Sequence, residues 1–139
     1  SDNIAVMGLS LGGGVVQGMA IVQPEIKSIV IASGLVSFHK VGGTGITPGM
    51  LEFFDFPDVV ASLAPKPIYL SWGEYEKSNF RFEVETSYSV NIVEKAYSIM
   101  NAEQNIIVIF HNDEFNQGHT FDVNSIIRFL NDTLGEPRI

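Results

Sequence analysis

The residues with the clearest capacity for chemistry stand near the start of the chain, in the pattern Gly8-Leu9-Ser10-Leu11-Gly12. A G-x-S-x-G pattern is typical of a serine nucleophile on a sharp turn between a strand and a helix. The turn holds the hydroxyl clear of the backbone, and small neighbours let the strand and the helix pass close together. We expect Gly8 and Gly12 to meet that need, and we predict that Ser10 is a nucleophile.

A serine nucleophile needs a base that removes its proton, and the chain has three histidines. We predict that His119 is this base, because it follows an apolar run on a loop and its neighbour Gly118 lets the ring approach Ser10. His111, at the end of the same apolar run, is an alternative base. His39 lies far earlier in the chain, and it either lines the site or takes no part.

The base in turn needs a carboxylate that orients it. An apolar run ending at Trp72 is followed by Gly73-Glu74-Tyr75-Glu76, which places two carboxylates directly after a strand. Glu85 is a third candidate further along the chain. The residues alone leave the choice among Glu74, Glu76 and Glu85 open.

These loops must be positioned by strands and helices, and the apolar pattern predicts both. Nearly continuous β-branched runs indicate four strands buried on both faces, and 3.6-residue spacing indicates helices between them. Strands that alternate with helices imply a parallel sheet. The expected strands are 3–7, 27–32, 67–72 and 105–110, and the expected helices are 11–22, a short one around 57–63, 83–100, and a last one from 123 to the Leu134-Gly135 stop.

Two segments resemble a known family of enzymes. Ala64-Pro65-Lys66-Pro67 followed by an apolar strand and Gly-x-x-acid, together with Gly118-His119-x-Phe121 before the last helix, is similar to α/β-hydrolases of the dienelactone hydrolase and acetyl xylan esterase type. The resemblance implies the C-terminal half of an α/β-hydrolase, with about four parallel strands flanked by helices. It also implies that Glu76 is the acid, where such enzymes usually carry aspartate, and that His119 is the base.

In that fold, the backbone N–H of the residue after the nucleophile stabilises the oxyanion, which here is Leu11. The second oxyanion donor comes from a loop before the nucleophile strand. Because the sequence opens on that strand, we expect residues 1–139 to be a single, partial α/β-hydrolase domain and a poor enzyme alone. We further expect the open edge of the first strand to promote self-association.

Composition excludes several classes of partner. Eight basic residues against sixteen acidic ones give a net charge of -8, which disfavours nucleic acid and anionic membrane surfaces. There is no cysteine, and the three histidines lack metal-binding spacing, so we predict no metal and no cofactor. No apolar run approaches the roughly 20 residues of a membrane helix. None of these features fixes a cellular compartment.

We therefore predict a serine hydrolase that acts on carboxylic esters through an acyl-enzyme, with a small-molecule or carbohydrate ester, such as an acetylated sugar, as substrate. Two alternatives remain open. One is a non-catalytic binding module that keeps the α/β-hydrolase fold. The other is a peptidase of the same fold, although such enzymes usually carry aromatic neighbours beside the serine, where this chain has leucines.

Overall fold

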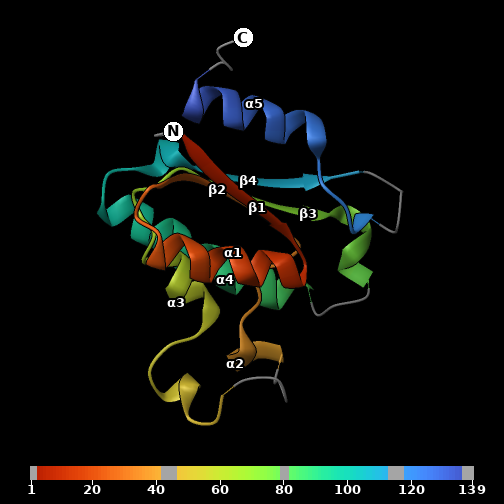
Figure 1. The fold of residues 1–139 in the computed structure, drawn as a ribbon. Helices are drawn as coiled ribbons and strands as arrows, with labels where there is room; N and C mark the ends of the chain where they lie inside the picture. Colours follow the sequence, from red (N-terminus) through yellow and green to blue (C-terminus); the bar gives the residue numbers. More distant parts are fainter. Residues whose placement is uncertain (1–2, 42–46, 79–81, 113–117, 136–139) are drawn as a thin grey trace.

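The computed structural model describes residues 3–41, 47–78, 82–112 and 118–135, and these form a parallel sheet with helices on both faces (Figure 1). The strands lie in the order β1-β2-β3-β4, so each strand pairs with the next one along the chain. The elements in chain order are β1 (Ile4–Leu9), α1 (Leu11–Val22), β2 (Ile26–Ala32), α2 (Phe38–Val41), η1 (Met50–Glu52), α3 (Phe56–Ala61), β3 (Ile68–Gly73), η2 (Glu74–Ser78), α4 (Phe82–Ile99), η3 (Glu103–Asn105), β4 (Ile106–His111) and α5 (Val123–Leu134).

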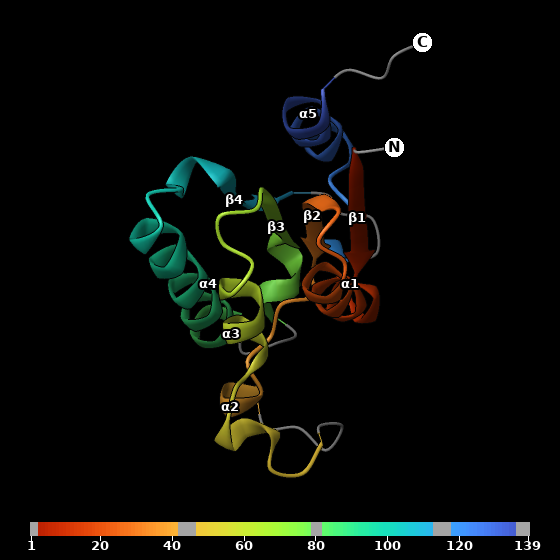
Figure 2. The ribbon, with the colours of Figure 1, turned by 60° about the vertical axis from the view of Figure 1, so that its left-hand side comes forward.

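Helices divide unequally between the two faces of the sheet. In Figures 1 and 2, α5 covers one face, and α1, α3 and α4 cover the other. Because successive side chains of a strand point to opposite faces, the apolar run of β2 supplies both cores. Ile29 and Ile31 pack with the α1 and α4 layer, whereas Val30 packs with Phe129 of α5.

The prediction that all four strands are buried on both faces is correct for β2 and β3 only. Every residue of β3 is buried, and all of β2 but Lys27 is. Strands β1 and β4 lie at the two edges of the sheet, where Met7 and Phe110 are exposed. An apolar run shows that a strand can be buried on both faces. The position of the strand in the sheet determines whether it is.

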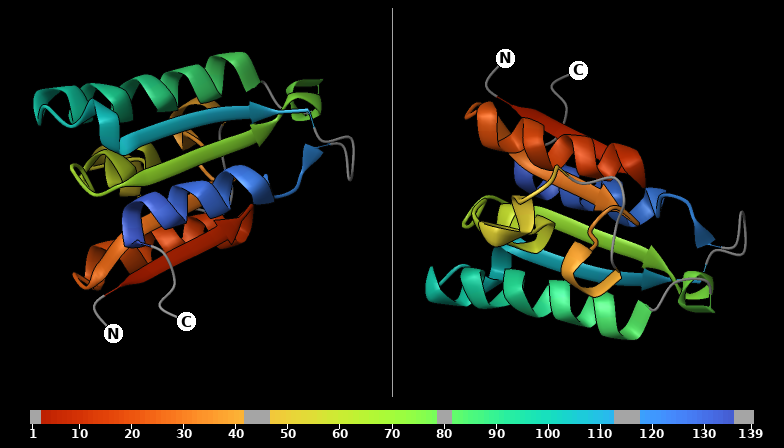
Figure 3. Two further views of the ribbon diagram at one scale, coloured as in Figure 1. Left: turned by 90° about the horizontal axis from the view of Figure 1, so that it is seen from above. Right: turned by 90° about the horizontal axis from the view of Figure 1, so that it is seen from below.

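The parallel direction brings the carboxyl ends of all four strands to one edge of the sheet (Figure 3). Leu9 pairs with Ala32, Ala32 pairs with Ser71, and Gly73 pairs with His111. The segments that follow these residues therefore start side by side. Within the described ranges, no helix is both long and apolar enough to cross a membrane.

Candidate active site

Ser10 occupies the sharp turn between β1 and α1. Its backbone has φ 57° and ψ -119°, a conformation that a non-glycine residue rarely adopts and that is costly unless its surroundings hold it. The Ser10 N–H donates to Ala32 O at 2.8 Å, which fastens the turn to β2. Ser10 is exposed, and its hydroxyl makes no cap hydrogen bond with α1. The hydroxyl is therefore presented at the edge of the sheet.

Glycines allow this turn, although not all at the positions predicted. A Cβ on Gly8 would lie 2.1 Å from Gly12 O, so only glycine fits at position 8. The expectation for Gly12 itself was wrong, because a Cβ there meets nothing within 4 Å. The second close approach is instead between Gly13 and Gly34, where a Cβ on Gly13 would lie 2.8 Å from the Gly34 Cα.

Glu76 lies in η2, the turn that directly follows β3, and only 5% of it is exposed. Its Oε2 accepts hydrogen bonds from Gly73 N at 2.9 Å and from Ser33 Oγ at 2.6 Å. Its Oε1 lies 2.6 Å from His119 Nδ1. An ionised carboxylate can only accept, so Nδ1 is the donor in this contact, and the ring directs Nε2 away from Glu76.

The loop that carries His119 is held close to β3. A Cβ on Gly73 would lie 2.3 Å from Gly118 O and 2.5 Å from the Gly118 Cα, so the two backbones touch where a side chain would separate them. Gly118 itself has φ 80°, which favours glycine. The His119 side chain remains 31% exposed to solvent.

The start of α5 fixes the other end of this loop. Asp122 caps the helix, because its side chain accepts from Ser125 N, and Tyr69 of β3 donates its hydroxyl to Asp122 Oδ2 at 3.3 Å. Partial burial opposes ionisation of Asp122, but hydrogen bonds from Ser125 and Tyr69 outweigh it and lower the Asp122 pKa below 3.8. Burial and the Asp122 charge raise the Tyr69 pKa to about 12.

The alternative residues occupy other places. Glu74 starts η2 and is half-buried, whereas the contacts with His119 Nδ1 and Ser33 Oγ described above belong to Glu76. Glu85 belongs to α4, and its side chain lies outside the described part of the structure.

The two alternative histidines belong to other elements, β4 and α2. His111 is buried at the end of β4, and its ring nitrogens have no hydrogen-bond partner among the described residues. His39 is exposed on α2 and lines a shallow groove with residues 47–49, 51 and 52 of the connection between α2 and α3.

Leu11 is the first residue of α1, and its side chain is 84% exposed. The first four N–H groups of a helix have no partner within it, and they carry the positive end of the helix dipole. The Leu11 N–H is the first of these groups and directly follows Ser10.

Ser33 was not singled out from the sequence. It follows β2 and has φ 48°, and its hydroxyl donates a hydrogen bond to Glu76. A signal was available, because Ser33 is the first polar residue after an apolar parallel strand, at the edge where sites of such sheets form.

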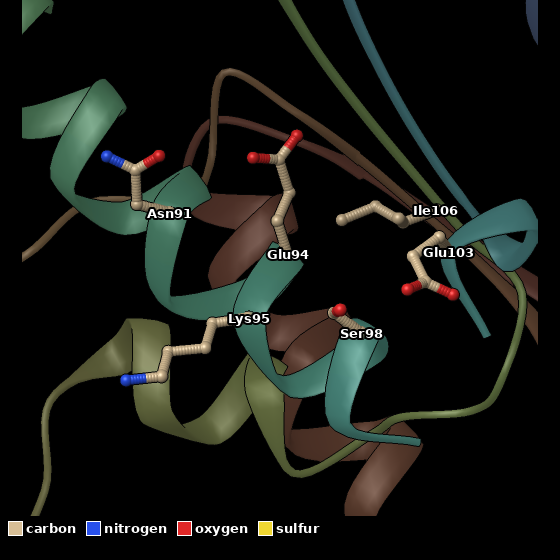
Figure 4. A pocket seen from close by; sticks show the side chains of 6 residues that line it. All are labelled: Asn91, Glu94, Lys95, Ser98, Glu103 and Ile106. Carbon is tan, nitrogen blue, oxygen red and sulfur yellow. The ribbon is translucent and has the colours of Figure 1, made fainter. Parts of the chain in front are cut away.

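A groove of about 510 Å³ lies away from this edge of the sheet (Figure 4). Its lining comes from α4, η3 and the first residue of β4, which is the amino end of that strand. Asn91, Glu94, Lys95, Ser98, Glu103 and Ile106 line it. The groove is thus separate from Ser10, Glu76 and His119.

Comparison with known proteins supplies a family. The model of the Abhydrolase family matches residues 39–127, a span that includes Glu76 and His119 and leaves Ser10 outside. Among curated proteins, none matches the chain.

Solved structures show the same fold at low sequence identity. A carbohydrate esterase family 15 glucuronoyl esterase from Caldicellulosiruptor kristjansonii is 16% identical with a TM-score of 0.71, over 97% of this chain and 46% of that one. A glucuronoyl esterase of the same family from Teredinibacter turnerae T7901 is 18% identical with a TM-score of 0.70, over 94% and 40%. The methylesterase BT1017 is 17% identical with a TM-score of 0.71, over 94% and 30%. This chain thus has the α/β-hydrolase fold and spans less than half the length of each of these proteins.

Proposed function

The chain belongs to the Abhydrolase family, and we propose that the protein is a serine hydrolase of carboxylic esters in which Ser10, His119 and Glu76 act together. The observation that carries this proposal is the 2.6 Å contact between Glu76 Oε1 and His119 Nδ1, at the edge of the sheet where the strained turn exposes Ser10. We also propose that residues 1–139 form part of one α/β-hydrolase domain.

In the proposed acylation step, Ser10 Oγ attacks the ester carbonyl carbon while His119 Nε2 takes the hydroxyl proton. Glu76 keeps the proton on Nδ1 and stabilises the imidazolium that forms. The tetrahedral intermediate then collapses, the bond to the leaving alkoxide breaks, and His119 returns its proton to that oxygen. The products are the free alcohol and an acyl-Ser10 ester.

Deacylation repeats these steps with water as the nucleophile. His119 removes a proton from the water, which attacks the acyl carbonyl, and the proton then passes to Ser10 Oγ as the acid is released. In both steps the Leu11 N–H donates to the carbonyl oxygen as it becomes negative, supported by the N-terminal end of α1.

The substrate class follows from the surroundings of Ser10 and from similar proteins. Ser10 is exposed and lies between two leucines, which favours small esters. The solved structures with this fold include glucuronoyl esterases and a methylesterase, which supports a carbohydrate ester as the natural substrate.

The test uses the full-length protein with 4-nitrophenyl acetate. We expect Ser10→Ala and His119→Asn each to lower kcat by about 10³-fold or more, because the members of such a triad act as a unit. His39→Asn is the matched histidine control, since His39 is exposed on α2, and its activity should stay within about twofold of the parent. Hydrolysis that survives Ser10→Ala would exclude this function.

A covalent probe separates this proposal from its alternatives without a known substrate. A fluorophosphonate should attach to Ser10 with loss of fluoride, and peptide mass spectrometry would locate the adduct. A protein that reacts with no such probe and hydrolyses no ester would instead be a binding module. Cleavage of peptides in preference to esters would identify a peptidase.

A further inference from the structure

The loop after β2 holds a hydroxyl that the proposed mechanism does not use. Ser33 Oγ donates to Glu76 Oε2 at 2.6 Å, across 43 residues of sequence. Ser33 has φ 48°, in the left-handed region that a serine rarely adopts. Such a conformation persists only where its surroundings hold it, and it is frequent at functional sites.

Contacts from β3 and from α1 hold Ser33 and the residue after it. The Ser33 N–H donates to Ser71 O of β3 at 2.7 Å. The next residue, Gly34, packs so tightly on α1 that a Cβ there would lie 2.6 Å from the Gly13 Cα. The fully buried Gln17 of α1 donates from Nε2 to Gly34 O at 2.9 Å. The loop is therefore fixed to the helix that begins at the nucleophile turn.

The loop after β2 orients the Glu76 carboxylate. A glutamate has one more rotatable bond than the aspartate that α/β-hydrolases usually carry, so more freedom must be removed before its carboxylate points in one direction. Two donors on Oε2, Ser33 Oγ and Gly73 N, fix the plane of the carboxylate. The remaining oxygen, Oε1, is then directed at His119 Nδ1.

We propose that Ser33 is a positioning residue of this site: its hydroxyl, carried on a loop anchored to α1, orients Glu76 toward His119. This inference rests on the proposed function, because it assigns a role within the same set of residues. It implies that loss of the hydroxyl reduces turnover more than substrate binding.

The kinetic test compares Ser33→Ala and Ser33→Gly in the full-length protein. Both remove the hydroxyl, but glycine also relieves the unfavourable φ. We expect both variants to lower kcat for 4-nitrophenyl acetate by about 10- to 100-fold with KM within about twofold, as for loss of a hydrogen bond to a charged group. Ser28→Ala is the control, because Ser28 lies in β2, is fully buried, and its hydroxyl has no partner among the described residues.

A spectroscopic readout reports on the acid and base without any substrate. In protein labelled with ¹⁵N-histidine, the Nδ1 proton shared with Glu76 should give a far-downfield resonance, assigned by its loss in His119→Asn. We expect the resonance to broaden or shift upfield in both Ser33 variants and to persist in Ser28→Ala.

The outcomes separate the two ideas. Parent-like kcat and an unchanged Nδ1 resonance in both Ser33 variants, with Ser10→Ala inactive, would overturn the role of Ser33 alone. Full activity in Ser33→Gly with a loss in Ser33→Ala would also overturn it, because backbone conformation would then be the cause. Full activity in Ser10→Ala would overturn the proposed function, while the resonance would still test whether Ser33 orients Glu76.

Discussion

The two sides of the candidate site differ in how completely the described residues enclose them. On the β3 side, Glu76 is buried and bonded to three partners, and the backbones of Gly73 and Gly118 touch. On the β1 side, Ser10 follows an edge strand, and the helix after it exposes apolar side chains. Glu76 and His119 are organised by contacts within this chain, whereas the described residues leave the surface beside Ser10 exposed.

This difference shows that the parts of one candidate site can be held in place by different kinds of contact. Hydrogen bonds and glycine contacts fix the direction of Glu76 and the loop of His119. The turn at Ser10 is strained, and its N–H is bonded to Ala32 O of β2. Substitutions on the β3 side should therefore change the positions of Glu76 and His119. Substitutions on the β1 side should change the exposed surface and the self-association of the chain.

The largest expected effect is on the β3 side, in Glu76→Gln of the full-length protein. We expect kcat for 4-nitrophenyl acetate to fall by about 10⁴-fold, as for loss of the acid in a serine triad, because the amide no longer holds the Nδ1 proton. Glu74→Gln is the matched control in the same turn and should stay within about twofold. An equal loss in Glu74→Gln would show that the acid has been assigned to the wrong residue.

Gly73→Ala tests whether the backbone contact keeps His119 in place. The new Cβ would meet Gly118 backbone atoms, which cannot move aside as a flexible side chain could. We expect a loss of about 10²-fold in kcat and about 1–3 kcal/mol in the free energy of unfolding.

Gly18→Ala in α1 gives the opposite expectation, because a Cβ there meets nothing within 4 Å. Removing a helical glycine should stabilise the protein by about 0.5–1 kcal/mol in urea unfolding. A Gly73→Ala variant as stable and active as Gly18→Ala would contradict the contrast between the two sides.

The exposed apolar residues on the β1 side should cause the chain to self-associate. Val15, Met19 and Val22 form an exposed apolar face on α1, with 69% of Val22 exposed, and Ile4 and Met7 lie exposed on the edge strand. We expect purified residues 1–139 to self-associate, and Val15→Lys with Val22→Lys to shift them toward monomer in multi-angle light scattering. A clean monomer of the unchanged chain would contradict this expectation.

The smallest expected effect concerns Asp122, which fixes the end of the His119 loop. Its lowered pKa means that ionised Asp122 stabilises the folded state. This stabilisation is fully present above pH 3.8 and is lost as the pH falls through the lower pKa of Asp122 in the folded state. Asp122→Asn keeps a good helix cap and should reduce the loss of stability at acidic pH. Asp122→Ala should lower the free energy of unfolding by about 1 kcal/mol at neutral pH. Urea unfolding between pH 2.5 and 7 measures the free energy of unfolding of both variants. An equal loss of stability at acidic pH in Asp122→Asn and in the parent would rule out this contribution.

Much of the fold could be predicted from the sequence because its signals are local. The helix expected at 11–22 has those bounds in α1, and the β-branched runs locate all four strands to within two residues at either end. Burial of β1 and β4 could not be predicted, because the sheet order that makes them edges depends on contacts between distant segments. The short turns η1, η2 and η3 carry too few residues for a periodic pattern.

The site divides along the same line. The sequence alone could place Ser10 on its turn, but it could not choose among Glu74, Glu76 and Glu85, since a single turn of η2 decides which side chain faces His119. Ser33 was missed because its partner is 43 residues away and its residue type is ordinary. Gly12 was expected at a close approach that belongs to Gly13 and Gly34, a contact between a helix and a distant loop.

The touching backbones at positions 73 and 118 also restrict how this protein can evolve. A side chain at position 73 requires the histidine loop to retreat, so no change there is neutral by itself. In a library randomised at both positions and selected for activity, glycine should return at 73 and, because of its φ of 80°, at 118 as well. New substrate preferences would then have to arise in other loops, while both positions keep glycine.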